Sequence, residues 1–366
     1  MKNLRAGLAI GTAVTAMIAL SSCASNEGGT PAGAASGGSS ASTSVSGTLN
    51  GVGSSAQGTA QDTWRAAFQQ ANSGVTVNYN PSGSGAGRTA FIAGGAQFAG
   101  SDSYLKDSEL SGTFALCDGK AIDIPVYISP IALVYNVEGV KSLQLDPATV
   151  AKIFKGDITK WNDPEIAKQN SGEKLPNATI DPVHRSDDSG TTNNFTNYLH
   201  AVAPSVWTQE ASDTFPYKTG DGANGTSGVI QAVQGGSNAI GYADLSKAGD
   251  LDVAKIKVGD KYVAPSTAGA SAVAADSEQQ SGRETNDLAI NVNRTTTNSD
   301  EYPLTLISNA IVCQTYKDSS VGSLVKAYMQ YVTSDEAQQA AEKAAGSAPL
   351  SGNLKSKVDT AVASIK

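Results

Sequence analysis

The chain has 366 residues, which is enough for two hydrophobic cores, because a single core stops growing at about 250–300 residues. Its formal net charge of −8 argues against a nucleic-acid-binding surface, which needs an excess of lysine and arginine. The hydrophobic content of 40% is ordinary for a soluble protein, whereas glycine, with 38 residues, is frequent.

The N-terminus has the pattern of an export signal. Lys2 and Arg5 precede an apolar stretch, residues 6–20, that is too short and too rich in small residues for a confident membrane span. The stretch ends in Leu-Ser-Ser followed by Cys23, which is typical of the lipobox of bacterial lipoproteins. We therefore predict a signal peptide over residues 1–22 and lipidation of Cys23. An ordinary secretory signal with an incidental cysteine is the alternative.

Residues 23–46 are predicted to be a tether. They consist mostly of Gly, Ser, Ala and Thr, and such a stretch cannot bury enough apolar area to fold. Ordered structure is expected to begin near Gly47.

Strand-like and helix-like patterns alternate after this point, which predicts an α/β fold. Strands are expected at 48–50, 75–79, 122–137, 239–242 and 302–312. Helices are expected from about Asp62, and at 88–93, 146–154, 193–202, 320–345 and 350–364. Residues 264–282 are small and polar, and we expect a surface excursion there.

Two of the apolar runs, 122–137 and 302–312, are unusually long and contain prolines. Because proline lacks the N–H that a sheet needs, we expect the first run to be two strands, joined where the chain crosses between two lobes. The second run mirrors it. Lobe one is then predicted to comprise 47–127 and 306–366, and lobe two 128–305.

Two cysteines remain beyond the predicted signal, Cys117 and Cys313. An even number in an exported chain suggests one disulfide, and both residues fall in the predicted lobe one. Two buried free thiols are the alternative.

Three short segments rich in glycine and hydroxyl residues lie after a predicted strand or before a predicted helix. They are residues 51–56 (GVGSSA), 82–88 (SGSGAGR) and 98–102 (FAGSD). Glycines there let backbone N–H groups and a helix N-terminus approach an anion. The first also matches a dinucleotide fingerprint, but no acidic residue follows in a clear second strand. Asp102, in the third, has a simpler interpretation as a helix N-cap.

A fourth segment, residues 184–195 (HRSDDSGTTNNF), combines more of the chemistry of an anion site. Arg185 offers a planar fork for an oxyanion, and Asp187 is placed to hold that fork. Ser189, Gly190 and Thr191 open a predicted helix, so hydroxyls, N–H groups and the helix dipole converge. The alternative is a capped helix with a surface ion pair.

With these segments and two further motifs, 155–161 (KGDITKW) and 238–242 (NAIGY), the chain resembles the phosphate-binding protein of bacterial phosphate ABC transporters. The resemblance runs from about Gly47 to the C-terminus in consistent order. It implies a two-lobed periplasmic-binding-protein fold of type II, with the ligand cleft between the lobes.

By position, the resemblance places the phosphate contacts on nine residues, with Asp187 in a supporting role. The nine contacts are Ser54, Ser55, Ala56, Ser84, Asp102, Arg185, Ser189, Gly190 and Thr191. The chain departs from the family at Ser55-Ala56, where Thr-Phe or a similar pair is usual. It departs again at Asp188, where glycine is usual, and we expect this carboxylate to point away from the site.

The resemblance implies inorganic phosphate as ligand, permease subunits with their ATPase as partners, and a lipid anchor on the extracytoplasmic face of the membrane. It implies no cofactor, no metal, no nucleic acid and no enzymatic activity. A phosphatase is the natural enzyme alternative, but the two histidines, His184 and His200, are far apart and no Ser-His-Asp set is legible. An adhesin on the same fold is a further alternative.

Overall fold

The computed structural model describes residues 45–366 of the chain. Its strands are β1 (Gly47–Gly53), β2 (Val75–Asn80), β3 (Phe98–Ser101), β4 (Ala121–Asn136), β5 (Gln144–Leu145), β6 (Asp181–Arg185), β7 (Asp221–Ala223), β8 (Ala239–Asp244), β9 (Asp252–Val253), β10 (Lys255–Val258), β11 (Lys261–Val263), β12 (Glu278–Gln279), β13 (Ile290–Asn291) and β14 (Thr305–Cys313). Its helices are α1 (Gly58–Ala71), α2 (Ser84–Ile92), α3 (Asp107–Leu110), α4 (Pro147–Lys155), α5 (Pro164–Ala167), α6 (Gly190–Val202), α7 (Gly225–Gly235), α8 (Thr267–Ala275), α9 (Ser319–Val332), α10 (Asp335–Ala345) and α11 (Gly352–Ala363), with a 3-10 turn at Leu245–Lys247.

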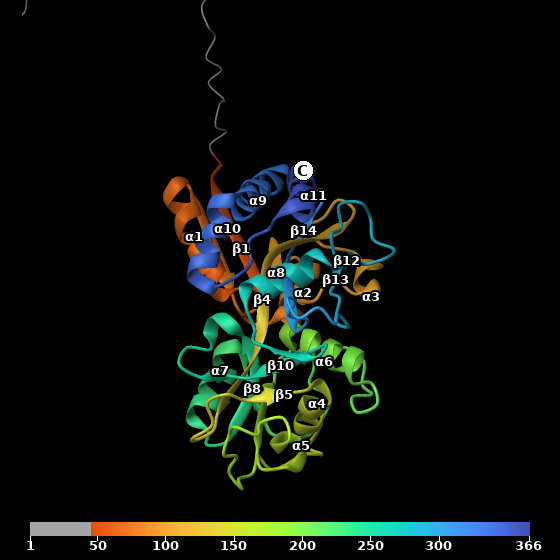
Figure 1. The fold of residues 1–366 in the computed structure, drawn as a ribbon. Helices are drawn as coiled ribbons and strands as arrows, with labels where there is room; N and C mark the ends of the chain where they lie inside the picture. Colours follow the sequence, from red (N-terminus) through yellow and green to blue (C-terminus); the bar gives the residue numbers. More distant parts are fainter. Residues whose placement is uncertain (1–44) are drawn as a thin grey trace, which may run out of the picture. The chain divides into compact units, whose positions relative to one another are not determined.

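The largest sheet has the strand order β2-β1-β3-β14-β4-β8-β6-β7, with β9 also paired to β4. Strand β4 lies in the middle of this order and runs from one part of the sheet to the other, as Figure 1 shows. Up to Pro130 it pairs antiparallel with β14, and from Ile131 onward it pairs antiparallel with β8. We call β1, β2, β3, β14 and β4 up to Pro130 the first half of the sheet. The remainder of β4 with β6, β7, β8 and β9 is the second half.

The continuity of β4 corrects the expectation that its prolines split it into two strands. Pro125 lies opposite Asn309, where the register between β4 and β14 shifts, and Pro130 forms the last pair with β14. Neither missing N–H therefore interrupts a regular ladder. The change of partner at Ile131 lies inside one strand rather than between two.

Helix boundaries follow local capping chemistry. Asp146 caps α4 by accepting a hydrogen bond from the Thr149 N–H at 2.7 Å, and Pro147 occupies the first turn. Gly156 ends the same helix with a φ of +89°, which a residue with a side chain rarely adopts. These signals explain why the observed helix lies within one residue of the expected one.

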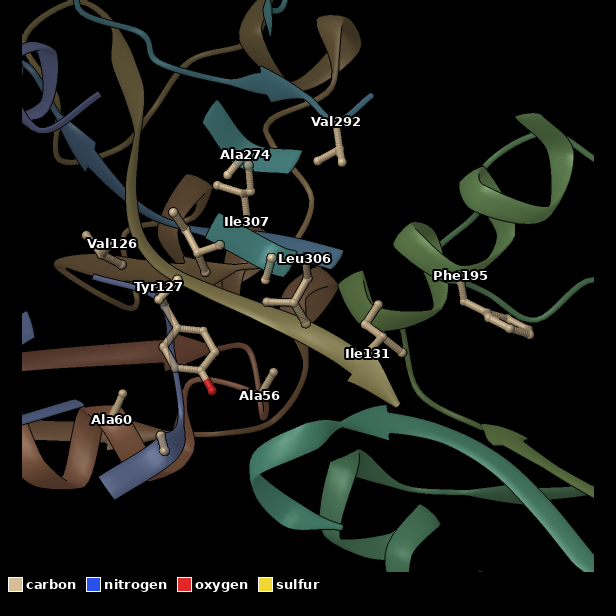
Figure 2. Close-up of a cluster of buried hydrophobic side chains, with 14 of the residues drawn as sticks. Ala56, Ala60, Val126, Tyr127, Ile131, Phe195, Ala274, Val292, Leu306 and Ile307 are labelled. Atoms are coloured by element: carbon tan, nitrogen blue, oxygen red, sulfur yellow. The ribbon is translucent and has the colours of Figure 1, made fainter. Parts of the chain in front are cut away.

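The hydrophobic core is continuous across both halves of the sheet, and Figure 2 shows part of it around Tyr127 and Leu306. A smaller cluster lies beneath α7 in the second half and includes Val183 and Val229. Helix α8 corrects the expected surface excursion, because Ala270 and Val273 are fully buried and the helix packs against β4 and β14. Small alanine side chains permit this close packing, and they also disguised the helix in the sequence.

The predicted disulfide is present between Cys117 and Cys313. It joins the segment after α3 to the last residue of β14, and both cysteines are buried. Within residues 45–366, no helix is long and apolar enough to cross a membrane. The predicted signal peptide, Cys23 and nearly all of the predicted tether lie outside the described residues.

Candidate anion-binding site

Four helix N-termini meet at one place in the described structure. Ser55 lies in the turn between β1 and α1, Ser84 is the first residue of α2, Ser189 caps α6, and Thr226 lies in the first turn of α7. The first two helices pack on the first half of the sheet and α7 packs on the second half, with α6 between. The Ser55 and Thr226 hydroxyls are 2.9 Å apart, so the two halves are in direct contact here. Helix N-termini carry partial positive charge, which favours an anion.

Asp102 follows β3 and lies at the centre of this arrangement. Its Oδ1 accepts hydrogen bonds from the Ser54 hydroxyl at 2.5 Å and the Ser308 hydroxyl at 2.6 Å. Its Oδ2 accepts from the Thr191 hydroxyl at 3.0 Å. Burial raises the pKa of Asp102, while these hydroxyls and the charge of Arg185 oppose the increase. The carboxylate caps no helix, so the simpler interpretation of this residue is wrong.

Arg185, the last residue of β6, is buried and faces the same place. Its Nε donates to Oδ1 of Asp187 at 2.7 Å and its Nη2 donates to Oδ2, so the fork that the sequence assigned to an anion is directed at Asp187. Nη1 is the nitrogen directed at the site, and it lies 3.4 Å from the Thr191 hydroxyl. Burial raises the pKa of Asp187, but hydrogen bonds and charge from Arg185 outweigh it and hold that pKa below its usual value. At 2% and 10% side-chain exposure, this is not a surface ion pair.

The segment 189–191 brings α6 against the loops of the first half. Ser189 caps the helix, since its hydroxyl accepts from the Thr192 N–H at 3.1 Å. Gly190 has no room for a side chain, because an added Cβ would lie 2.5 Å from the Ser84 Oγ and 2.8 Å from the Asp102 Cβ. The Asp102 N–H in turn donates to the Ser84 Oγ at 3.1 Å. The N-terminus of α6 therefore lies in close contact with the segments that carry Ser84 and Asp102.

The two departures from the family pattern are accommodated. Asp188 is exposed, and its carboxylate accepts a hydrogen bond from the Thr214 hydroxyl at 2.9 Å, pointing away from Asp102 as expected. Its carbonyl accepts from the Gly85 N–H at 3.0 Å. Ala56 is fully buried, and its N–H donates to the Ser54 Oγ at 3.1 Å.

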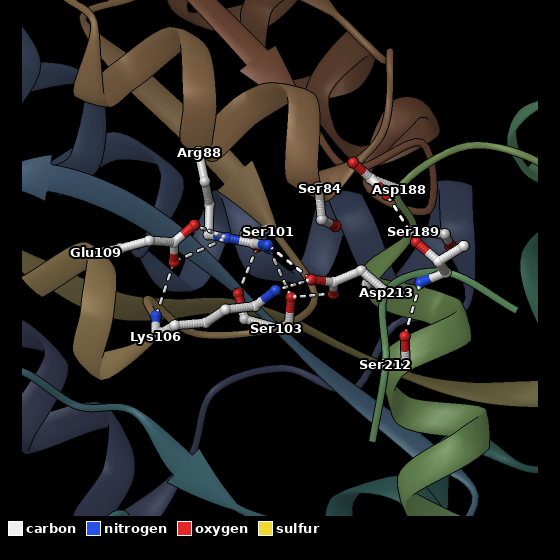
Figure 3. Close-up of polar contacts among 12 residues, drawn as sticks. Ser84, Arg88, Ser101, Ser103, Lys106, Glu109, Asp188, Ser189, Ser212 and Asp213 are labelled. Atoms are coloured by element: carbon white, nitrogen blue, oxygen red, sulfur yellow. Dashed lines mark hydrogen bonds and ion pairs between the residues drawn. The ribbon is translucent and has the colours of Figure 1, made fainter. Parts of the chain in front are cut away.

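An ion cluster beside the site, buried at Arg88 and Asp213, also joins the two halves, and Figure 3 shows it. Asp213, from the segment after α6, accepts hydrogen bonds from Arg88 of α2 at 2.8 Å and Ser103 at 3.0 Å, and pairs with Lys106 at 2.8 Å. Burial raises the pKa of Asp213, but the charges of Arg88 and Lys106 outweigh it and lower the pKa overall. Glu109 holds the Nε of Arg88 at 3.0 Å. This cluster fixes the relation between α2 and the chain that follows α6.

Sequence reasoning missed Ser308 and Asp213. Ser308 and Asn309 interrupt an otherwise apolar stretch of β14, and that contrast was the available signal. Asp213 lies in an irregular segment and meets Arg88 over 125 residues of chain, which no local pattern reveals. Within residues 45–366, no group of three or more His, Cys, Asp and Glu residues is arranged to hold a metal ion. His184 instead stacks on Phe215 with ring centroids 4.2 Å apart.

This fold and site define a binding protein of two joined α/β halves. The family model described as PBP superfamily domain matches residues 38–336 of the chain. A phosphate-binding protein, PstS 2, of Mycobacterium tuberculosis is 36% identical over 307 residues, covering 82% of each chain. PstS 3 of Mycobacterium leprae is 36% identical over 312 residues, with the same coverage.

Solved structures agree on the fold. A high-affinity periplasmic phosphate-binding protein bound with phosphate aligns with a TM-score of 0.71 at 24% identity, covering 86% of this chain and 93% of that one. A phosphate-binding protein from Stenotrophomonas maltophilia aligns with a TM-score of 0.65 at 21% identity, covering 87% and 93%. The chain belongs to the PBP superfamily and, within it, to the family of PstS phosphate-binding proteins. The expected periplasmic-binding-protein fold is thereby confirmed.

Proposed function

We propose that this chain captures inorganic phosphate on the extracytoplasmic side of the membrane and delivers it to the permease of an ABC transporter. The observation that carries the proposal is the convergence of four helix N-termini on one buried carboxylate, Asp102, and one buried guanidinium, Arg185. The N-termini and Arg185 stabilise an oxyanion, while Asp102 accepts the proton that phosphate retains near neutral pH. The ligand contacts are the nine residues that the family resemblance assigns, with Asp187 holding Arg185 in place.

Capture proceeds by closure of two lobes on the ligand. We propose that lobe one comprises 47–127 and 306–366 and lobe two 128–305, except that the segment from α8 to β13 belongs to lobe one. Arg283 of that segment lies 3.7 Å from Asp123 of β4 and donates to the Leu105 carbonyl, so the segment moves with lobe one. Differential affinity of the ligand for the closed arrangement drives the motion.

The protein binds and releases phosphate without transforming it. A phosphatase needs a metal cluster or an activated nucleophile. In the proposed site the Ser54, Thr191 and Ser308 hydroxyls all donate to the single Asp102 carboxylate, so no one of them is singled out for activation as a nucleophile. Acylation of Cys23 holds the protein at the membrane, close to its permease. An adhesin would need no such internal anion site.

Isothermal titration with phosphate tests the proposal, after the purified protein has been unfolded and refolded to remove bound ligand. We expect one site per chain with a dissociation constant below about 1 μM, equivalent to about 8 kcal/mol. No heat of binding from refolded protein would overturn the proposal. Release of phosphate from a phosphomonoester at a rate above that of buffer would favour the hydrolase instead.

A further inference from the structure

A chain of buried hydrogen bonds leads from the core of the first half to Asp102. The Tyr328 hydroxyl of α9 donates to Oε1 of Gln61 at 2.9 Å, and Nε2 of Gln61 donates to Oε1 of Gln57 at 2.9 Å. Nε2 of Gln57 donates to the Ser308 Oγ at 2.7 Å, and Ser308 donates to Oδ1 of Asp102 at 2.6 Å. All five residues are 4% exposed or less.

The direction of this chain is fixed by its chemistry. Nε2 of Gln57 also lies 3.1 Å from the Asn309 carbonyl, which can only accept, so this side of the Gln57 amide must be its donating NH2 group. The Ser308 oxygen therefore accepts from Gln57, and its single proton is committed to Asp102. A hydroxyl with a free choice could instead have accepted from a protonated carboxyl.

The other two hydroxyls around Asp102 are committed in the same way. The Ser54 Oγ accepts hydrogen bonds from the backbone N–H groups of Ala56 at 3.1 Å and Gln57 at 3.3 Å. The Thr191 hydroxyl oxygen accepts a hydrogen bond from Nη1 of Arg185 at 3.4 Å. An ionised carboxylate has about four acceptor positions. Ser54 and Ser308 occupy both positions on Oδ1, and Thr191 occupies one on Oδ2. One position on Oδ2 remains, and it can only accept.

We infer that Ser308, oriented by Gln57, is a specificity-determining positioning residue that obliges Asp102 to accept a proton from the bound anion, so that the site selects protonated oxyanions over fully ionised ones. The inference rests on the proposed function for the identity of the ligand. The other ionisable groups that act on Asp102 are Arg185, whose charge favours ionisation, and Tyr79 and Asp244 on β2 and β8. Of these, only Arg185 supports the ionised form.

The test compares Ser308→Ala with Thr305→Val. Thr305 lies on the same strand and is equally buried, but its hydroxyl donates to the Tyr302 carbonyl rather than to Asp102. Dissociation constants for phosphate and sulfate are measured by titration calorimetry from about pH 5 to about pH 8. In Ser308→Ala we expect the ratio of phosphate to sulfate affinity to fall at least about tenfold, because losing one hydrogen bond to a charged group is typically worth that factor. The loss should grow as the pH falls, since a protonated Asp102 can donate to sulfate.

A readout without ligand separates this inference from the proposed function. The titration of the Asp102 carboxyl carbon is followed by NMR in the ligand-free wild type and in both variants. We expect its pKa to increase in Ser308→Ala and to remain unchanged in Thr305→Val. A shifted pKa with no phosphate binding in any variant would overturn the proposed function and leave the role of Ser308 standing. Phosphate binding with neither the pKa nor the ratio altered in Ser308→Ala would overturn the inference.

Variants farther along the chain guard against misfolding of Ser308→Ala. Gln57→Met removes the donor behind Ser308, and Tyr328→Phe removes only the first hydroxyl. The effect on the phosphate-to-sulfate ratio should decrease in the order Ser308, Gln57, Tyr328. Equal effects at all three positions, matching their loss of thermal stability, would show a general structural role and overturn the inference.

Discussion

The Arg88 guanidinium and the Asp213 carboxylate form a buried ion pair, 2.8 Å long, between a helix of the first half of the sheet and the chain that follows α6. With the hydroxyl pair of Ser55 and Thr226, it gives two direct connections around the candidate site. Neither charge of the ion pair belongs to the proposed ligand contacts. The energy that holds the halves together is thus partly independent of the anion.

Asp213→Asn should destabilise the protein. Removing one partner of a buried pair typically costs about 3–5 kcal/mol, because the other charge is left uncompensated, and retained hydrogen bonding places this variant near the lower end. Urea unfolding measures the free energy of unfolding. Asp62→Asn is the matched control, because Asp62 forms an exposed pair with Arg65 that is worth little. Equal unfolding midpoints for the two variants would show that the cluster contributes no stability.

The same variant gives a signed pH dependence. The folded-state pKa of Asp213 is lowered, so its contribution is fully present above the unfolded value of about 3.9 and is lost as pH falls through the folded value. Acid should therefore reduce the unfolding free energy of the wild type more steeply than that of Asp213→Asn. If the unfolding free energies of the wild type and of Asp213→Asn decreased with the same slope as the pH is lowered, this prediction would be contradicted.

Arg185→Ala should weaken phosphate binding at least about tenfold, since a charge-assisted hydrogen bond is worth about 1.5–3 kcal/mol and about 1.4 kcal/mol is a factor of ten. Arg185→Lys should recover only part of the loss, because an ammonium cannot hold Asp187 with two parallel bonds and still present a donor to the ligand. Calorimetric titration measures both. Arg65→Ala is the control, because Arg65 pairs with Asp62 and the Val77 carbonyl and is not among the proposed ligand contacts. A loss under twofold for Arg185→Ala would place the anion elsewhere.

Asp102→Asn should relax discrimination between phosphate and sulfate. An amide can donate where a carboxylate only accepts, and a site that pairs with a proton on its ligand can reject an analogue lacking it by factors of about 10⁴ or more. Titration with both anions gives the ratio. Asp188→Asn makes the same chemical change at a carboxylate turned toward Thr214, and it should leave the ratio unchanged. An unaltered ratio in Asp102→Asn would assign discrimination to other groups.

Loss of the Cys117–Cys313 bond should lower the free energy of unfolding by roughly 2–4 kcal/mol. The double variant Cys117→Ser, Cys313→Ser, compared with the wild type in urea, measures this. Because both cysteines are buried, the native wild type should resist a mild reductant that acts readily on the unfolded chain. Peptide mapping without reduction should find the linked pair, and two free thiols in exported protein would contradict the bond.

Cys23→Ala should release the protein from the membrane fraction without altering phosphate affinity, since lipidation needs the cysteine and the site lies elsewhere. Fractionation followed by titration of the released protein measures both. Retention in the membrane fraction would contradict lipid anchoring at this residue.

The sequence was most informative where local chemistry determines structure. Glycine and hydroxyl residues between a strand and a helix predicted the turns of Ser54, Ser84 and Ser189, because such turns need particular backbone angles and caps. Residue patterns were insufficient where tertiary pairing decides. The continuity of β4 depends on a register shift opposite Asn309, and the partner of Arg88 is set by the packing of α6.

Gly190 lies where the two halves approach each other too closely to admit a side chain. Any side chain there would strike the Ser84 Oγ, the Asp102 Cβ or the Ser103 nitrogen before the present arrangement was reached. A single methyl group at this position, as in Gly190→Ala, would hold the segments of Ser84 and Asp102 away from α6 without changing any of their functional groups. A substitution at Gly190 would thus separate the initial binding of an anion from the closure of the two lobes around it.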